Sequence, residues 1–161
     1  MNTQFFCLEC RQPISAGVHE FSQELYGYSL CMKDQYYFEE SGATAQSIDL
    51  YLALKARNFP VKLEYFDGFK RIGIAVSGKL FIEVSGQDYL ADWEMICGLA
   101  NASDQQKLKI PVIIVSNGML DTKRTFSRVV NELSKACRVI LQPDLGFSVS
   151  CAPRWTSVQL Q

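Results

Sequence analysis

The sequence lacks any hydrophobic run long enough to cross a membrane. Its longest apolar runs, such as Ile110 to Val115, are far shorter than the roughly 20 residues that a membrane helix needs. The first residues do not place a basic segment before an apolar one, so we expect no secretory signal. Gly- or Pro-rich tracts and internal repeats are absent as well. These absences predict a soluble protein of the cytoplasm that has no membrane partner.

The composition is that of a chain that can build a core. Hydrophobic residues make up 48% of the 161 residues and charged residues 20%, which excludes the apolar-poor composition of disordered proteins. This length suits one domain, or one domain with a small appendage.

Charge is almost balanced in total but unevenly distributed along the chain. The formal net charge of -1 argues against nonspecific nucleic-acid binding over the whole surface. Residues 1–99 carry 8 basic and 13 acidic side chains, a net of -5, whereas residues 100–161 carry 8 basic and 4 acidic ones, a net of +4. Two interpretations of the basic part stay open, a basic binding face and an ordinary solvated helix surface.

Three of the six cysteines lie close together near the N-terminus. Cys7 and Cys10 form a Cys-x-x-Cys pair, and Cys31 follows after a spacer of about 20 residues. In a reducing compartment such a trio is typical of metal ligands. The other three cysteines stand singly in apolar sequence and are expected to be small buried side chains: Cys97, Cys137 and Cys151.

Structural zinc needs four ligands in a tetrahedron, and the trio supplies three thiolates. Asp34 stands three residues after Cys31 and is the first candidate for the fourth ligand, with His19, the chain's single histidine, as the alternative. A carboxylate is a weaker choice than a thiolate but is chemically allowed. The competing interpretation is that the cysteines pack a small hairpin without metal. An appendage of about 40 residues has little core of its own, which favours the metal.

The pattern of residues 1–42 predicts a small module. The stretches Val18 to Ser22 and Leu25 to Leu30 are expected to form two short strands, and Cys31 to Glu40 a short helix. We place the end of this module near residue 42, where Ser41-Gly42 interrupts the pattern.

The remainder predicts a domain over residues 43–138, followed by an extension or edge strand over residues 139–161. Its two-residue Ser77-Gly78 connection is a hairpin signal. The expected order is a helix, three strands, a helix, a strand and a helix, which makes the chain a mixed α/β protein. These elements are Thr44 to Arg57, Val61 to Tyr65, Arg71 to Val76, Lys79 to Val84, Tyr89 to Leu99, Ile110 to Ser116 and Thr122 to Cys137.

Two segments carry a resemblance to known proteins. The stretch from Cys7 to Gln35, with its Cys-x-x-Cys and its Cys31-Met32-Lys33-Asp34, resembles a small zinc ribbon that some bacterial proteins carry before a nuclease-like domain. The stretch from Asp67 to Val76 and from Leu80 to Gly86 resembles the core of the restriction-endonuclease-like, or PD-(D/E)XK, superfamily. The expected order of helices and strands agrees with that superfamily.

The resemblance also implies that catalysis is lost. Active members hold Mg²⁺ or Mn²⁺ between an acid on the second core strand and another on the third, and Gly73 stands where the first acid is expected. Glu83 matches the second acid. We therefore expect a catalytically degenerate protein that serves as a nucleic-acid-binding or assembly subunit. The alternatives are an active endonuclease that uses Glu83 with Asp67 or Glu64, and a Glu83 that is merely paired with Lys79 or Lys70.

Two kinds of partner are expected, nucleic acid and protein. Basic side chains at the start of a strand and in the first half of a helix are candidates for phosphate contacts: Lys107, Lys109, Lys123, Arg124 and Arg128. A third hypothesis is a protein-interaction module without nucleic acid, in which Tyr36-Tyr37-Phe38 and Trp155 contact a partner. Packing inside the protein is the competing role for these aromatic residues.

Overall fold

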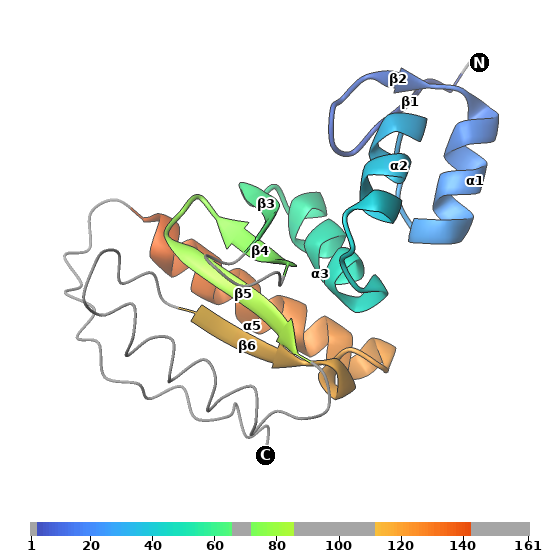
Figure 1. Ribbon diagram of the computed structural model, residues 1–161. Coiled ribbons are helices and arrows are strands. Elements are labelled where there is room, and N and C mark those ends of the chain that lie inside the picture. The colour runs from blue at the N-terminus through green and yellow to red at the C-terminus, as the bar shows by residue number, and fades with distance from the viewer. Residues whose placement is uncertain (1–2, 66–71, 86–111, 143–161) are drawn as a thin grey trace. The chain divides into compact units, whose positions relative to one another are not determined.

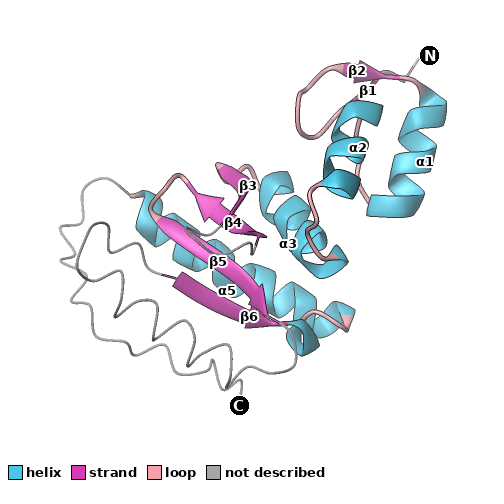
Figure 2. Cartoon of the chain, viewed as in Figure 1, coloured by secondary structure: helices cyan, strands magenta, loops and turns pink. Residues whose placement is uncertain are grey.

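The computed structural model describes residues 3–65, 72–85 and 112–142, and these form a mixed α/β structure (Figures 1 and 2). The chain divides into two compact units, Met1–Val76 and Ser77–Gln161. In the described residues, no helix combines the length and the apolar character that a membrane span requires.

The first unit begins with a small N-terminal module, by which we mean residues 5–40. Strands β1 (Phe5–Phe6) and β2 (Pro13–Ile14) pair antiparallel, with Phe5 opposite Ile14. Helices α1 (Ala16–Tyr26) and α2 (Met32–Glu40) follow (Figure 1). The Tyr26 hydroxyl donates to the carbonyl of Gln35 at 3.5 Å, so the two helices are in contact.

Helix α1 corrects the sequence prediction for this segment, because the two strands expected over Val18 to Ser22 and Leu25 to Leu30 are wrong. The Ser15 hydroxyl caps the helix by accepting from the Val18 amide, and Gly27 ends it with a left-handed φ of 71°. Val18, Ser22 and Tyr26 recur every four residues and are buried or half-buried, which is helical spacing. The module is therefore a hairpin with two helices.

Helix α3 (Ala45–Ala56) is buried on nearly all sides and packs against the N-terminal module. Its cap is Thr44, which accepts from the Ser47 amide at 3.2 Å. The rings of Tyr51 and Phe38 lie 5.8 Å apart, and Lys55 Nζ lies 3.5 Å from Glu9 Oε2. Contacts within the first unit therefore cross residue 42, where the sequence predicts the end of the module.

Strands β3 (Val61–Tyr65) and β4 (Ile72–Val76) complete the first unit. They pair antiparallel with Val61 opposite Val76 and Glu64 opposite Gly73. After β4, Ser77 and Gly78 have φ values of 49° and 65°, the left-handed pair that a type I′ turn requires. The predicted turn position is confirmed.

The second unit contains β5 (Leu80–Ser85), β6 (Val112–Ser116), the short 3-10 helix η1 (Asn117–Met119) and α5 (Lys123–Leu141). Strands β5 and β6 run parallel, with Glu83 beside Ile114. Thr122 caps α5 by accepting from the Thr125 amide at 3.2 Å. Side chains at helical spacing are buried along α5: Val129, Val130, Leu133, Ser134 and Cys137.

The sequence prediction is confirmed for α2, α3, β3, β4, β5, β6 and α5, with small shifts at their ends. Helix α5 continues beyond the predicted end at Cys137 to Leu141, so the first residues of the expected C-terminal extension are helical. The helix expected over Tyr89 to Leu99 and residues 143–161 lie outside the described residues.

Candidate metal centre

Cys7 and Cys10 lie on a tight turn that leads from β1 to β2. The Cys7 amide donates to the Gln12 carbonyl at 2.9 Å, and the Arg11 amide donates to the Cys7 carbonyl at 3.0 Å. Arg11 adopts a left-handed φ of 61°, which closes the turn. The Cys31 amide also donates to Cys7 Sγ at 3.2 Å, a contact that favours a charged thiolate.

The second pair of side chains comes from the start of α2. Cys31 is the residue that precedes the helix, and Asp34 lies in its first turn. The amides of Asp34 and Gln35 both donate to the Cys31 carbonyl, which fixes the two positions relative to each other. The positive end of the helix dipole is at this turn and favours thiolate and carboxylate groups. The structure therefore places Cys31 and Asp34 at the start of the helix that the sequence predicts over Cys31 to Glu40.

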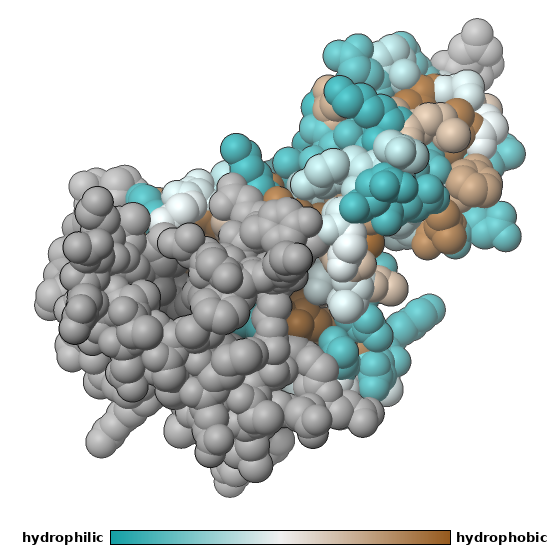
Figure 3. All heavy atoms as spheres, in the orientation of Figure 1, coloured by the Kyte–Doolittle hydropathy of each residue, from teal (hydrophilic) through white to brown (hydrophobic). Residues whose placement is uncertain are grey.

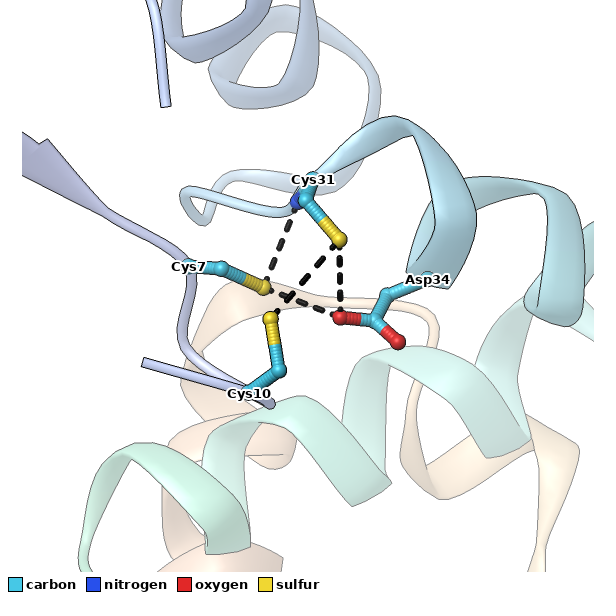
Figure 4. Close-up of side chains that lie close together, drawn as sticks. All are labelled: Cys7, Cys10, Cys31 and Asp34. Atoms are coloured by element: carbon cyan, nitrogen blue, oxygen red, sulfur yellow. Dashed lines mark hydrogen bonds between the residues drawn. The ribbon is translucent and has the colours of Figure 1, made fainter. Parts of the chain in front are cut away.

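The four side chains converge on one point (Figure 4). Their ligand atoms all lie within 4.8 Å of one another. Asp34 Oδ2 accepts from Cys7 Sγ at 3.0 Å and from Cys31 Sγ at 3.1 Å, and Cys10 Sγ lies 3.8 Å from Cys31 Sγ. These four residues lie close enough to hold a metal ion.

The spacing fits a tetrahedral thiolate site. With Zn–S bonds of about 2.3 Å, the sulfur atoms of a tetrahedron are about 3.8 Å apart, and Cys10 and Cys31 have that separation. Asp34 Oδ2 lies closer to the sulfurs of Cys7 and Cys31, at 3.0 and 3.1 Å, because it accepts their hydrogen bonds. All four described cysteines, which are Cys7, Cys10, Cys31 and Cys137, are free thiols, so no disulfide competes with a metal in the described residues.

Protonation in the cluster depends on burial and on the shared carboxylate. Burial raises the pKa of the Cys7 thiol to about 12, and the hydrogen bond to Asp34 adds to the effect. Burial also raises the pKa of the Cys31 thiol. For Asp34, burial acts to raise the pKa, but hydrogen bonds from the three thiols lower it below the usual value. The protons of Cys7 and Cys31 therefore stay on sulfur, and a metal ion would have to displace them.

His19, the alternative fourth ligand, lies elsewhere in the module. Its ring stacks on Phe5 with the centroids 3.8 Å apart, and its Nδ1 lies 2.7 Å from Ser29 Oγ. The structure thus places Asp34 beside the three thiols and gives His19 a packing role between β1 and the segment before α2.

Two buried polar side chains support the cluster, and sequence reasoning missed both. Ser22 Oγ donates to the Tyr28 carbonyl at 2.6 Å and accepts from the Leu30 amide at 2.8 Å. Gln35 Nε2 donates to the Leu30 carbonyl at 2.9 Å. Together they fix the segment between α1 and α2 that leads to Cys31. A polar residue on the buried face of α1 is the signal that would have identified Ser22, but it is visible only once the segment is known to be a helix.

Glu9 connects the Cys-x-x-Cys turn to α3, and sequence reasoning missed this role too. It stands between the two cysteines and forms an ion pair with Lys55. Tyr51 lies nearby, and burial together with the Glu9 carboxylate raises the pKa of its phenol. The turn is therefore tied to the larger part of the first unit.

The predicted catalytic residues do not form a described metal site. Glu83 lies on β5 and is only 3% exposed, Gly73 is buried on β4, and Asp67 lies outside the described residues. A buried carboxylate is costly unless it has partners, and Glu83 does have an interaction partner. In the part of the chain that the structure describes, the cysteine cluster is the one group of side chains arranged to hold a metal.

The structure describes only some of the basic and aromatic residues that the sequence suggests for contacts with a partner. Lys123, Arg124 and Arg128 are exposed on the first half of α5, while Lys107, Lys109 and Trp155 lie outside the described residues. Phe38 is buried against Tyr51, whereas Tyr36 and Tyr37 are 63% and 51% exposed. Of the three neighbouring aromatic residues, one packs inside the first unit and two remain exposed.

Comparison with family models, with curated proteins and with solved structures finds no match to this chain.

Proposed function

We propose that this chain is a catalytically degenerate nuclease-like protein that acts as a nucleic-acid-binding or assembly subunit. The observation that carries the proposal is Gly73, a buried glycine on β4 at the position where the superfamily it resembles has its first metal-binding acid. Glycine has no side chain to ligate a cation, and Glu83 alone would hold Mg²⁺ or Mn²⁺ weakly. The order of α3, β3, β4, β5, β6 and α5 supports the nuclease-like part of the proposal.

We further propose that the cysteine cluster holds structural zinc. Three thiolates form a soft ligand set that suits zinc and disfavours Mg²⁺ or Ca²⁺. Cys7, Cys10, Cys31 and Asp34 would fill all four positions of a tetrahedron, which is typical of structural rather than catalytic zinc. In this role the metal would join the Cys-x-x-Cys turn to the start of α2.

The test combines metal analysis with a cleavage assay. Purified protein should contain one equivalent of zinc, and single- and double-stranded DNA and RNA should remain intact with Mg²⁺ or Mn²⁺. Cleavage that disappears in Glu83→Ala would contradict the proposal and favour the endonuclease alternative, with Asp67 and Glu64 as the next acids to replace. Binding of an oligonucleotide without cleavage is the expected result.

A second candidate function, protein binding, is favoured by the exposed apolar side chains of the N-terminal module. Of the seven large hydrophobic residues exposed in the described residues, six belong to this module: Phe6, Phe21, Leu25, Met32, Tyr36 and Tyr37. Figure 3 shows hydrophobic side chains among the polar ones on its surface. A salt titration separates the two candidates, because phosphate contacts weaken steeply with salt and an apolar interface does not.

A further inference from the structure

The outer side of α5 carries a row of five polar side chains, of which four are basic. Its members are separated by four, three, four and three residues, so they return to one side of a helix with 3.6 residues per turn. The row, which we call the α5 basic row, consists of Arg124, Arg128, Asn131, Lys135 and Arg138, and all five are exposed. The buried side chains of α5 project from the opposite side.

The charge of this row is not neutralised by the helix itself. Helix α5 contains five basic residues and one acidic residue, Glu132. Glu132 pairs with Lys135 at 2.7 Å, but the two side chains are 50% and 67% exposed, and such a pair is worth only about 0–1 kcal/mol. Arg124, Arg128 and Arg138 form no ion pair with any described residue.

The length of the row suits a polyanion better than a small anion. From Arg124 to Arg138 the helix rises by about 21 Å, at about 1.5 Å per residue. Four cations in line over that length match a chain of regularly spaced phosphates, whereas one phosphate or sulfate would contact only one or two of them.

The rest of the surface of α5 argues for a phosphate backbone over a membrane or over stacked bases. Its apolar side is already buried in the protein, so α5 cannot insert into a lipid surface as an amphipathic helix does. The row has no aromatic member on which a base could stack. Contacts made by this row would therefore carry little sequence information.

We propose that the α5 basic row binds the sugar-phosphate backbone of a nucleic acid, which rests on the nucleic-acid-binding function proposed above. This assignment adds Lys135 and Arg138 to the candidates that the sequence suggests. It also separates Lys123 from them, because Lys123 lies about 100° around the helix from Arg124. Lys123 is exposed and serves as a control cation on the same helix.

Two triple variants of the full chain with the same change in charge test the proposal. The row variant carries Arg124→Gln, Arg128→Gln and Arg138→Gln. The control variant carries Lys62→Gln, Lys79→Gln and Lys123→Gln, which are exposed positions outside the row. Glutamine keeps a good helix propensity, and circular dichroism confirms that both variants are folded. Fluorescence anisotropy then measures binding to labelled single- and double-stranded oligonucleotides between about 50 and 200 mM salt.

The expected result is a loss confined to the row variant. Its Kd at about 50 mM salt should rise by at least about tenfold, and its salt slope should flatten by about 2.7 for duplex DNA or about 2.1 for single strands. The control variant should keep a slope close to that of the original protein.

Equal losses in both variants, or tight binding in the row variant, would overturn the proposal while leaving nucleic-acid binding intact. No binding by the original protein would also defeat the nucleic-acid-binding part of the proposed function. Binding to phosphatidylserine vesicles alone would assign the row to a membrane.

Discussion

The N-terminal module and helix α5 differ in charge and in what they expose. The module, residues 5–40, contains two basic and six acidic side chains, a net of -4, and six of its large hydrophobic residues are exposed. Helix α5 has a net charge of +4 and exposes one large hydrophobic residue, Val139. An acidic, partly apolar surface repels phosphates and suits a protein, whereas a basic polar surface suits a nucleic acid.

The two regions also differ in what holds them together. Helix α1 buries only Ser22 fully, and α2 buries only Gln35 and Phe38, so neither helix has a long apolar side. Helix α5 instead buries a row of apolar side chains that includes Val129, Val130 and Leu133. Burial at about 25 cal/mol per Å² can stabilise α5, but the module needs further links. We therefore expect the cysteine cluster to contribute to the stability of the N-terminal module and hardly to that of α5.

The largest expected effect is that of breaking the cluster. In Cys7→Ala we expect zinc to be lost and amide protons of the N-terminal module to exchange rapidly, because zinc-dependent folding of small modules is worth about 10–16 kcal/mol of binding free energy. Amides in α5 should keep their protection. Hydrogen exchange with mass spectrometry, alongside metal analysis, measures both regions in one experiment.

Cys137→Ala is the matched control, because Cys7 and Cys137 are both fully buried. It should retain one equivalent of zinc and lose only about 1 kcal/mol of stability from a small cavity in the second unit. Two outcomes would contradict this prediction: Cys7→Ala could keep its zinc, or both variants could lose amide protection in the same region. Either would mean that a metal does not stabilise the module while apolar packing stabilises α5.

The next effect is a pH dependence that reverses when metal binds. In the metal-free protein the pKa of Cys7 is raised from 9.0 to about 12, so the protonated thiol stabilises the module below pH 9, and this contribution is lost as the pH rises toward 12. Zinc binding must displace thiol protons. The zinc affinity should therefore fall by about tenfold for each unit that the pH is lowered, for each proton released.

Competition with a coloured chelator between about pH 6 and 8 measures the zinc affinity, and thermal unfolding of the chelated protein above pH 9 measures the opposite trend. A zinc affinity that does not change with pH would mean that the thiols are already ionised in the metal-free protein.

Most of the contrast between the N-terminal module and α5 can be predicted from the sequence. The buried hydrogen bonds of Ser22 and Gln35 that support the cysteine cluster cannot. The spacing of Cys7, Cys10, Cys31 and Asp34 predicts the cluster because a Cys-x-x-Cys turn and a helix start hold their side chains locally. Helix α3 and strand β3 have long, consistent patterns, and their predicted bounds agree with the structure to within two residues. Helix α1 has few apolar residues, so its sequence fits both the alternating pattern of a strand and the spacing of a helix. Only the capping residues Ser15 and Gly27 favour the helix.

A smaller effect is expected at Ser22, the support that the sequence does not reveal. Ser22→Ala removes one hydroxyl and leaves the Leu30 amide and the Tyr28 carbonyl without their partner, which costs about 1–3 kcal/mol for buried groups. Because this segment positions Cys31, zinc affinity should fall together with stability. Ser127→Ala, at an exposed position of α5, should change stability by less than about 0.5 kcal/mol. Unchanged zinc affinity in Ser22→Ala would show that Cys31 is held by α2 alone.

The smallest effect compares the same substitution in the two regions and should change sign between them. Arg11 has a left-handed φ of 61° in the Cys-x-x-Cys turn, a conformation that costs a non-glycine residue about 1 kcal/mol. Arg11→Gly should therefore stabilise the module by up to about 1 kcal/mol, less the extra freedom of glycine in the unfolded chain. Arg128→Gly in the interior of α5 should instead destabilise that helix by about 1 kcal/mol. Hydrogen exchange resolves the two regions separately, and a loss of protection in Arg11→Gly would mean that the arginine side chain contributes more to the turn than its backbone strain costs.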